Sequence, residues 1–261
     1  MTVIQRQEIL QDISFFTATP KAKFYDTLFA HLDVSAMKKA AAGTGRKGFP
    51  KEAMLCAFIV MKCEGFSQIT DLADYLNNNL IIAHYCGFNI MRPLPSYWTF
   101  DRFVRNIDNA LLKEIMQSQA LALYELGVLD ASFIGLDSTP IAANTVQNNP
   151  KSFQPNKFTK ERQPKADPDC RLGVHTASNQ HSEKNYEFYW GYKSHVLVDC
   201  ISGLPLFEMT TPANVADSTI ALDVLSKTNV FLPLRECTFI GDKAYDVRSI
   251  YNTVKTVCHE A

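Results

Sequence analysis

Two short stretches of the sequence end in the same way. "FIGLD" (133–137) and "FIGD" (239–242) each run from apolar residues, past a glycine, to an aspartate. A carboxylate at the edge of an apolar core is unfavourable unless a positive charge lies close to it. A divalent cation can satisfy two such carboxylates at once, and aspartate oxygens suit Mg²⁺ or Mn²⁺. If the two strands are neighbours in one sheet, Asp137 and Asp242 are predicted to share a divalent metal site.

Each aspartate also has a simpler interpretation. A single aspartate at the end of a strand is usually a turn former or a helix cap. Asp246 fits that role, because it directly precedes the helical pattern "VRSIYNTVK". Asp242 taken alone favours the same role. The matched pair of strands favours a shared site for Asp137 and Asp242.

The composition is that of an ordinary globular protein. Of the 261 residues, 46% are hydrophobic and 20% are charged, and the net charge is −1. No overall basic field therefore points to nucleic acid, although local patches can outweigh the total. The seven cysteines form no CxxC pair, which predicts reduced thiols in a cytoplasmic protein, not disulfides or a zinc site. The N-terminus has no apolar signal core, and the longest apolar run, 53–61, is too short for a membrane span.

The first half of the chain has helical patterns. One begins at Pro50, others follow Ser67 and Ser96 as expected caps, and a long one ends at Gly127. Short helices joined by tight turns are typical of helix-turn-helix proteins. The region 1–128 is therefore predicted to be helical and helix-turn-helix-like.

The second half, 129–261, has short apolar strands. Residues 141–185 are polar and rich in lysine and arginine, which predicts a loop or insertion, and 186–211 reads as a hairpin. A helical pattern covers 217–228, with Asp217 as the expected cap. The predicted fold class is α+β, with a helical N-terminal region followed by a mixed β-sheet with helices.

Five stretches resemble the motifs of one protein family. They are "PLPSYWTFDRFVRNI" (93–107), "GLDSTPI" (135–141), "GYKSHVLVD" (191–199), "TPANVADST" (211–219) and "GDKAYD" (241–246). The last four, in this order and at this spacing, resemble the motif series of bacterial insertion-sequence transposases of the DDE type. The first resembles the N-terminal DNA-binding region of the same group.

The resemblance implies a fold, an activity and a partner. It implies a ribonuclease-H-like catalytic domain over 129–261 and a DNA-binding region over 1–128. Asp137 and Asp242, together with a glutamate, would hold two Mg²⁺ or Mn²⁺ ions, which activate a water or a DNA 3′-hydroxyl and stabilise the leaving oxygen. The implied partners are the terminal inverted repeats of the element and target DNA, both double-stranded, bound by a homodimer.

The third carboxylate is not evident. After Asp242 the acidic residues are Asp246 and Glu260. Glu260 follows what reads as a helix end and the start of a fifth strand, so it is not assigned as the catalytic glutamate. The chain is therefore expected to stop before that glutamate and to be inactive in DNA cleavage and strand transfer on its own.

Several residues are predicted to support the site. Lys193 and His195 are two apart on a strand and share a face, where they would hold a phosphate if Asp137 lies on that face. The alternative is an ordinary polar strand face. Lys243 would either neutralise phosphate or be a surface lysine. Glu208 is expected to be solvated.

Basic residues of the helical region are predicted to bind DNA as a group, although for any one of them a solvated helix face is the simpler interpretation. They are Lys38, Lys39, Arg46, Lys47, Arg102 and Arg105. Arg102 and Arg105 share one helix face. Tyr97 and Trp98 are expected in the core, and Asn214 in a turn after a strand.

Two other functions remain open from the sequence. One is a truncated relative that binds the element ends without catalysis and competes with the intact enzyme. The other is a different ribonuclease-H-like nuclease, which would cleave without strand transfer and without preference for inverted repeats.

Overall fold

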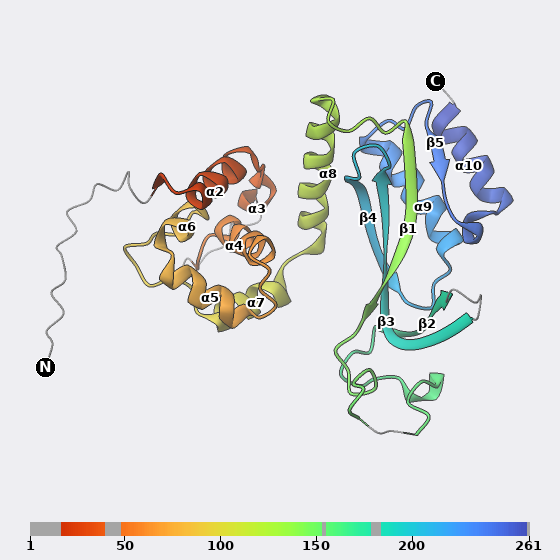
Figure 1. The fold of residues 1–261 in the computed structure, drawn as a ribbon, viewed down its shortest axis with the longest axis horizontal. Coiled ribbons are helices and arrows are strands. Elements are labelled where there is room, and N and C mark those ends of the chain that lie inside the picture. The colour runs from red at the N-terminus through yellow and green to blue at the C-terminus, as the bar shows by residue number, and fades with distance from the viewer. Residues whose placement is uncertain (1–16, 40–47, 153–154, 179–183, 260–261) are drawn as a thin grey trace, which may run out of the picture. The chain divides into compact units, whose positions relative to one another are not determined.

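The computed structural model describes residues 17–39, 48–152, 155–178 and 184–259 (Figure 1). The chain divides into two compact units, Met1–Ile115 and Met116–Ala261. This boundary differs from the change from helices to strands near residue 128 that the sequence predicts. The assignment of 1–128 and 129–261 as functional domains stays a prediction.

The first unit is helical. Its helices are α2 (Pro20–His31), α3 (Ser35–Lys39), α4 (Lys51–Cys63), α5 (Ile69–Asn78), α6 (Leu80–Tyr85), α7 (Tyr97–Asn106) and the start of α8 (Asn109–Glu125). α4 follows Pro50, as predicted, because proline has a backbone angle suited to a helix start. α5 is preceded by Gln68 and not capped by Ser67. Ser96 stands at the N-cap of α7, but its hydroxyl contacts Thr99 Oγ1 at 3.3 Å and does not cap the backbone.

The core of the first unit holds α4 between its neighbours. Ala53, Ala57 and Val60 of α4 are fully buried against Leu72 of α5 and Phe100 of α7. Removing this apolar surface from water is the main source of stability for the helices.

The second unit is built on a five-stranded mixed sheet. Its strands are β1 (Phe133–Ala142), β2 (Arg171–Ser178), β3 (Lys184–Asp199), β4 (Pro205–Pro212) and β5 (Thr238–Ile240). β3 is the central strand and pairs antiparallel with β1, β2 and β4, whereas β5 pairs parallel with β1. If β2 is set aside, β1, β3 and β4 form an antiparallel meander to which β5 is added beside β1.

Two helices complete this unit. α9 (Asp217–Phe231) packs against β3 and β4, and α10 (Arg248–His259) packs against α9 (Figure 1). The apolar face of the sheet, with Leu136, Leu197 and Phe207, is buried against α9. The α+β prediction is confirmed, because helices pack on one mixed sheet. Within the described residues, no helix is long and apolar enough to cross a membrane.

Four details differ from the sequence predictions. First, the segment 141–185 contains strand β2, which was expected to be loop. The N-terminal half of β3 extends beyond β1, and β2 pairs with this extension from Gly191 to Lys184. The side chains of Val174, Tyr186 and Phe188 are largely exposed there. This strand pair therefore lacks the buried apolar pattern by which a strand is recognised in a sequence.

Second, two of the cysteines are paired, which corrects the prediction of reduced thiols. A disulfide joins Cys237, before β5, to Cys258, at the end of α10, and the other five cysteines are free. The two cysteines are 21 residues apart, and no spacing rule connects them, since only the packing of α10 on the sheet brings them together.

Third, residues 255–259 continue α10 and do not begin a fifth strand. Fourth, Asp217 is the first residue of α9, where Ala216 occupies the N-cap, and no side chain caps the backbone. Its carboxylate accepts a hydrogen bond from Lys193 of strand β3 instead.

Candidate active site

Asp137 and Asp242 lie on neighbouring strands. β1 and β5 run parallel, with Ile134 opposite Phe239 and Gly135 opposite Ile240. Each aspartate comes two residues after this last pair, Asp137 within β1 and Asp242 just past the end of β5, so both lie in the same direction along the two strands. Both also line one cavity of about 420 Å³, together with Gly135, Thr139, Val196 and Gly241. The two carboxylates are therefore brought to one place, as the sequence predicts.

Alternation along β1 explains why Asp137 reaches this cavity. Leu136 points into the core and is buried, so Asp137 points to the opposite face and is exposed. At Gly135, which lines the cavity, an added Cβ would lie 2.9 Å from Cys200 Sγ, so the glycine allows the Cys200 side chain to pack beside the strand.

Each carboxylate uses one of its oxygens to accept a hydrogen bond from a nearby backbone N–H group. Asp137 Oδ1 accepts from the N–H of Ser138 at 2.7 Å, and Asp242 Oδ1 accepts from the N–H of Ala244 at 2.8 Å. The second bond caps the single turn of 3₁₀-helix Lys243–Tyr245. Asp242 is therefore a turn former, as its simpler interpretation holds. Neither Oδ2 is hydrogen-bonded to a residue that the structure describes, so each carboxylate retains one oxygen for a ligand.

The donor set fits a divalent cation only in part. Across 17–39, 48–152, 155–178 and 184–259, no three or more His, Cys, Asp or Glu side chains are grouped to hold a metal. Mg²⁺, however, is commonly bound by one or two carboxylates plus substrate phosphates and water. Two exposed aspartates beside one open cavity satisfy that pattern, provided that DNA supplies the remaining oxygens.

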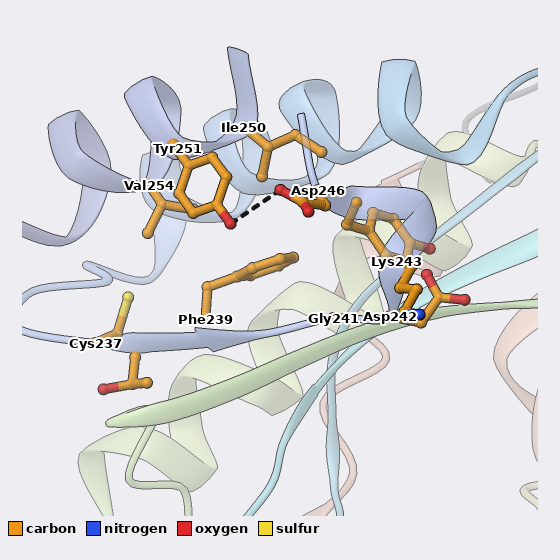
Figure 2. Close-up of a pocket in the computed structure, with 11 residues that line it drawn as sticks. Cys237, Phe239, Gly241, Asp242, Lys243, Asp246, Ile250, Tyr251 and Val254 are labelled. Atoms are coloured by element: carbon orange, nitrogen blue, oxygen red, sulfur yellow. Dashed lines mark hydrogen bonds between the residues drawn. The ribbon is translucent and has the colours of Figure 1, made fainter. Parts of the chain in front are cut away.

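A second cavity of about 450 Å³ lies on the other side of Asp242, between β5 and α10. Figure 2 shows Asp242 and Lys243 at one end of it and Phe239 along its floor. Asp246 lines it as well and accepts a hydrogen bond from Tyr251 at 3.1 Å. Among the residues that the structure describes, no backbone N–H at the start of α10 donates to the Asp246 side chain, so the contact with Tyr251 stands in place of the expected cap.

Tyr245 is the buried residue beneath the aspartates. Burial raises the pKa of its phenol, and the charges of Asp217, Asp137 and Asp242 raise it further. The phenol therefore stays neutral, and it adds no negative charge to a site that already holds carboxylates. Tyr245 is not recognisable from the sequence as part of the site, since an aromatic residue in a turn carries no sign of which charges it will lie beside.

Lys193 and His195 lie on the other face of the sheet. Asp137 is paired with Val196, whereas Ser138 is paired with His195, and directly paired residues share a face. The condition set for a joint phosphate site, that Asp137 lies on the face of Lys193 and His195, is not met.

These two residues form a cluster with Asp217 instead. Lys193 Nζ lies 2.9 Å from Asp217 Oδ1 and 3.3 Å from the carbonyl oxygen of Val215. His195 is 0% exposed, and its Nε2 lies 2.8 Å from Thr211 Oγ1. Its Nδ1 is 3.7 Å from Asp217 Oδ1. Burial lowers the pKa of His195, although the charge of Asp217 opposes the shift. A phosphate could reach His195 only if the side chains that cover it moved.

The other candidates in this unit have separate surroundings. Lys243 is exposed and lines the second cavity beside Asp242. Glu208 is half-buried and accepts from Ser194 Oγ at 2.8 Å and Thr210 Oγ1 at 2.6 Å, so it is hydrogen-bonded to protein where solvent was expected. Asn214 is exposed in the turn after β4, as predicted.

The basic candidates of the first unit are placed only in part. Arg102 and Arg105 are exposed on α7, and Arg105 Nε lies 2.8 Å from Asp101 Oδ2. Lys38 and Lys39 belong to α3, whereas Arg46 and Lys47 lie outside the described residues. The prediction that Tyr97 and Trp98 are core residues is wrong, since they are 41% and 61% exposed.

The fold and site define an α+β protein whose mixed sheet carries two aspartates on neighbouring strands beside one cavity. Comparison with known families makes this specific. A family described as "Transposase DDE domain" matches residues 122–258, more than half of the chain, and one described as "Transposase domain (DUF772)" matches residues 14–106. The chain belongs to the DDE transposases, which confirms the resemblance seen in the sequence. It is a DNA transposase, an enzyme class that cleaves DNA and transfers strands.

Two solved structures are similar to the chain at low levels. They are "Mos1 transposase paired-end complex with left transposon end" (12% identity, TM-score 0.28, covering 93% of this chain and 67% of that chain) and "Crystal structure of a pre-cleavage Mos1 transpososome" (12%, 0.27, 93% and 68%). TM-scores of this size are too low to support an argument about the site. No curated protein matches the chain.

Proposed function

We propose that Asp137 and Asp242 are the metal-binding catalytic aspartates of an insertion-sequence transposase. The observation that carries the proposal is their convergence on one cavity from two parallel neighbouring strands, β1 and β5. The two residues are 105 positions apart in the sequence (242 − 137), so a local turn cannot account for their meeting.

The carboxylates would act as ligands and as positioning groups. The free oxygens of Asp137 and Asp242 would hold Mg²⁺ or Mn²⁺, which in two-ion sites activates the attacking oxygen and stabilises the leaving oxygen of a phosphodiester. The bonds from Ser138 and Ala244 restrict the rotation of both carboxylates before DNA arrives. Tyr245, whose phenol is kept neutral by burial, adds no negative charge close to the two aspartates.

The DNA contacts are proposed by position. Lys243, exposed beside Asp242, is a candidate for a phosphate close to the scissile bond. Lys193 and His195 remain candidates only if the Lys193–Asp217 ion pair opens on DNA binding. Arg102, Arg105 and the basic residues Lys38, Lys39, Arg46 and Lys47 would hold phosphates of the duplex further away. The DNA would be the terminal inverted repeats and the target, bound by a cytoplasmic homodimer.

The test is metal binding in the presence of DNA. Mn²⁺ is titrated, with electron paramagnetic resonance as readout, into the chain mixed with an element-end duplex. We expect Asp137→Asn and Asp242→Asn each to lower the affinity for Mn²⁺, read from the signal of bound Mn²⁺, by at least about 10- to 100-fold. Asp246→Asn is the matched control, because Asp246 is also exposed and lies four residues from Asp242. Unchanged Mn²⁺ affinity in both variants of the pair would rule the proposal out.

A non-catalytic DNA-binding role is the second candidate. It is favoured by the absence, within the described ranges, of a third side chain grouped with Asp137 and Asp242 for a metal. The purified chain would then bind element ends and slow strand transfer by an intact enzyme without cleaving DNA itself. Mg²⁺-dependent strand transfer by this chain alone would contradict that role and the sequence-based expectation of inactivity.

A further inference from the structure

Helix α7 presents two opposite faces. Phe100 is 0% exposed, and Phe103 is partly buried. Both pack on Phe58 of α4, with ring centroids 5.7 and 5.9 Å apart. This aromatic contact fixes which side of the helix faces away from the core.

The outward side carries an aromatic residue and two arginines in one stripe. Trp98, Arg102 and Arg105 occupy positions i, i+4 and i+7, which lie one above another on a helix. Tyr97 lies beside Trp98, with ring centroids 4.9 Å apart and planes inclined by 33°. The two rings leave a joined aromatic surface in water at the start of the helix, and exposed apolar patches mark interaction sites.

The stripe is suited to a polyanion. No ion pair joins Arg102 to any residue that the structure describes, and the pair of Arg105 with Asp101 is exposed and therefore weak. The backbone N–H groups of Tyr97 and Trp98, at the start of the helix, likewise donate to none of the described groups. Such N–H groups attract phosphate.

We propose that Trp98 and Tyr97 stack on an unpaired DNA base, while Arg102 and Arg105 bind the neighbouring phosphates. In a duplex the base faces are covered by their neighbours, so an exposed indole can stack only on a base that is unpaired or at an end. Aromatic platforms beside cationic groups are the usual means of binding single strands. This inference rests on the proposed function, that the chain binds DNA, and adds that it recognises a single-stranded segment there.

A second copy of the chain is a less suitable occupant. A symmetric contact through this stripe would bring four guanidinium groups together, and the weakly paired Asp101 is the one carboxylate of α7 that could offset them. Repulsion between like charges disfavours that contact. DNA phosphates have the complementary charge.

The chain offers its own spectroscopic probe. It has two tryptophans, and the other, Trp190, is 1% exposed, with its Nε1 donating to the carbonyl oxygen of Lys157 at 2.9 Å. Stacking of a base on Trp98 should therefore quench the exposed part of the fluorescence. The full chain is titrated with a single-stranded oligonucleotide and with a blunt duplex of the same sequence.

We expect the single strand to quench the fluorescence and the blunt duplex to quench it far less. Trp98→Ala should remove the quenching and weaken single-strand binding, measured by anisotropy of a labelled oligonucleotide, by roughly 5- to 150-fold, the range for one stacked base. Trp98→Phe should retain most of the affinity. Met91→Ala is the matched control, because Met91 is 89% exposed and lies outside α7.

Three results would overturn the proposal. They are single-strand binding that leaves Trp98 fluorescence unchanged, a Trp98→Ala variant with wild-type affinity, and a Trp98→Ala variant that changes the sedimentation of the free protein and not its DNA binding. Failure of the proposed function looks different, since Mn²⁺ binding at Asp137 and Asp242 would then be absent while single-strand binding persisted.

Discussion

Asp242 combines an observed structural role with the proposed metal-binding role in one side chain. One oxygen caps the turn that follows β5, and the other is left for a ligand. The structural and the functional interpretations of a strand-end aspartate are therefore compatible, because a carboxylate has two oxygens. The turn fixes the orientation of the carboxylate, which is what a metal ligand needs before the metal arrives.

His195 should make the stability of the protein depend on pH. Its imidazole is buried beside Asp217, Lys193 and Glu208, and its pKa in the folded protein lies below the usual 6.5. As the pH falls below 6.5, the unfolded chain takes up a proton that the folded chain does not. The free energy of unfolding therefore decreases, by at most about 1.4 kcal/mol per pH unit. The decrease ends once the pH is below the lowered pKa of the folded state.

The measurement is urea unfolding between pH 7.5 and 5.5. His195→Gln, which can keep the hydrogen bond to Thr211, should show a smaller loss of stability over this interval than the wild type. His84→Gln is the control, because His84 is exposed and should leave the slope unchanged. Equal slopes for wild type and His195→Gln would show that His195 does not cause the pH dependence.

At the scale of elements, the close pairing of β3 with both β1 and β2 depends on Gly191. This residue is opposite Ala142 of β1 and Arg171 of β2 at the same time. A Cβ at Gly191 would clash with the carbonyl oxygen of Ile141 and lie 3.0 Å from the nitrogen of Ala143. These are backbone atoms, so no side chain can rotate away.

Gly191→Ala is therefore expected to destabilise the second unit by about 3 kcal/mol or more, the upper end for an overpacked site. Gly48→Ala, where nothing lies within 4 Å of the added Cβ, serves as the neutral control. Both are compared by urea unfolding followed by circular dichroism. A Gly191→Ala variant as stable as Gly48→Ala would show that β1 and β3 separate easily at this point.

At the scale of the whole molecule, the chain consists of two compact units, and the disulfide belongs to the second. The bond joins residues 21 positions apart, and the segment between them contains β5, Asp242 and most of α10. By restricting the unfolded chain, a loop of this size contributes about 3 kcal/mol. The contribution concerns the unit that carries the candidate active site.

Calorimetry with and without a reducing agent should therefore show a selective effect. The transition of the second unit is expected to move to lower temperature by roughly 6 to 12 °C on reduction, while that of the first unit stays in place. Cys237→Ser should reproduce the shift without a reducing agent, and Cys200→Ser, which removes an exposed free thiol, should not. Equal shifts in both transitions would contradict a local role for the bond.

The sequence alone predicted the α+β class and the candidate pair of aspartates, and its motifs resembled the transposase family. These follow from local patterns, since an apolar run that ends in a carboxylate is visible wherever the chain is read. The predictions that failed concern relations between distant residues. The disulfide, the exposure of Trp98 and the strand β2 each depend on what packs against a segment.

Only the tertiary structure decided which candidates lie together. Asp137 and Asp242 meet because β5 adds to β1 in parallel, whereas Lys193 and His195 are turned away from Asp137 by a one-residue difference in register. A one-residue shift in a strand reverses the face of every side chain, and a sequence does not state the pairing of its strands. The spacing of two residues could therefore predict that Lys193 and His195 share a face, but not which face it is.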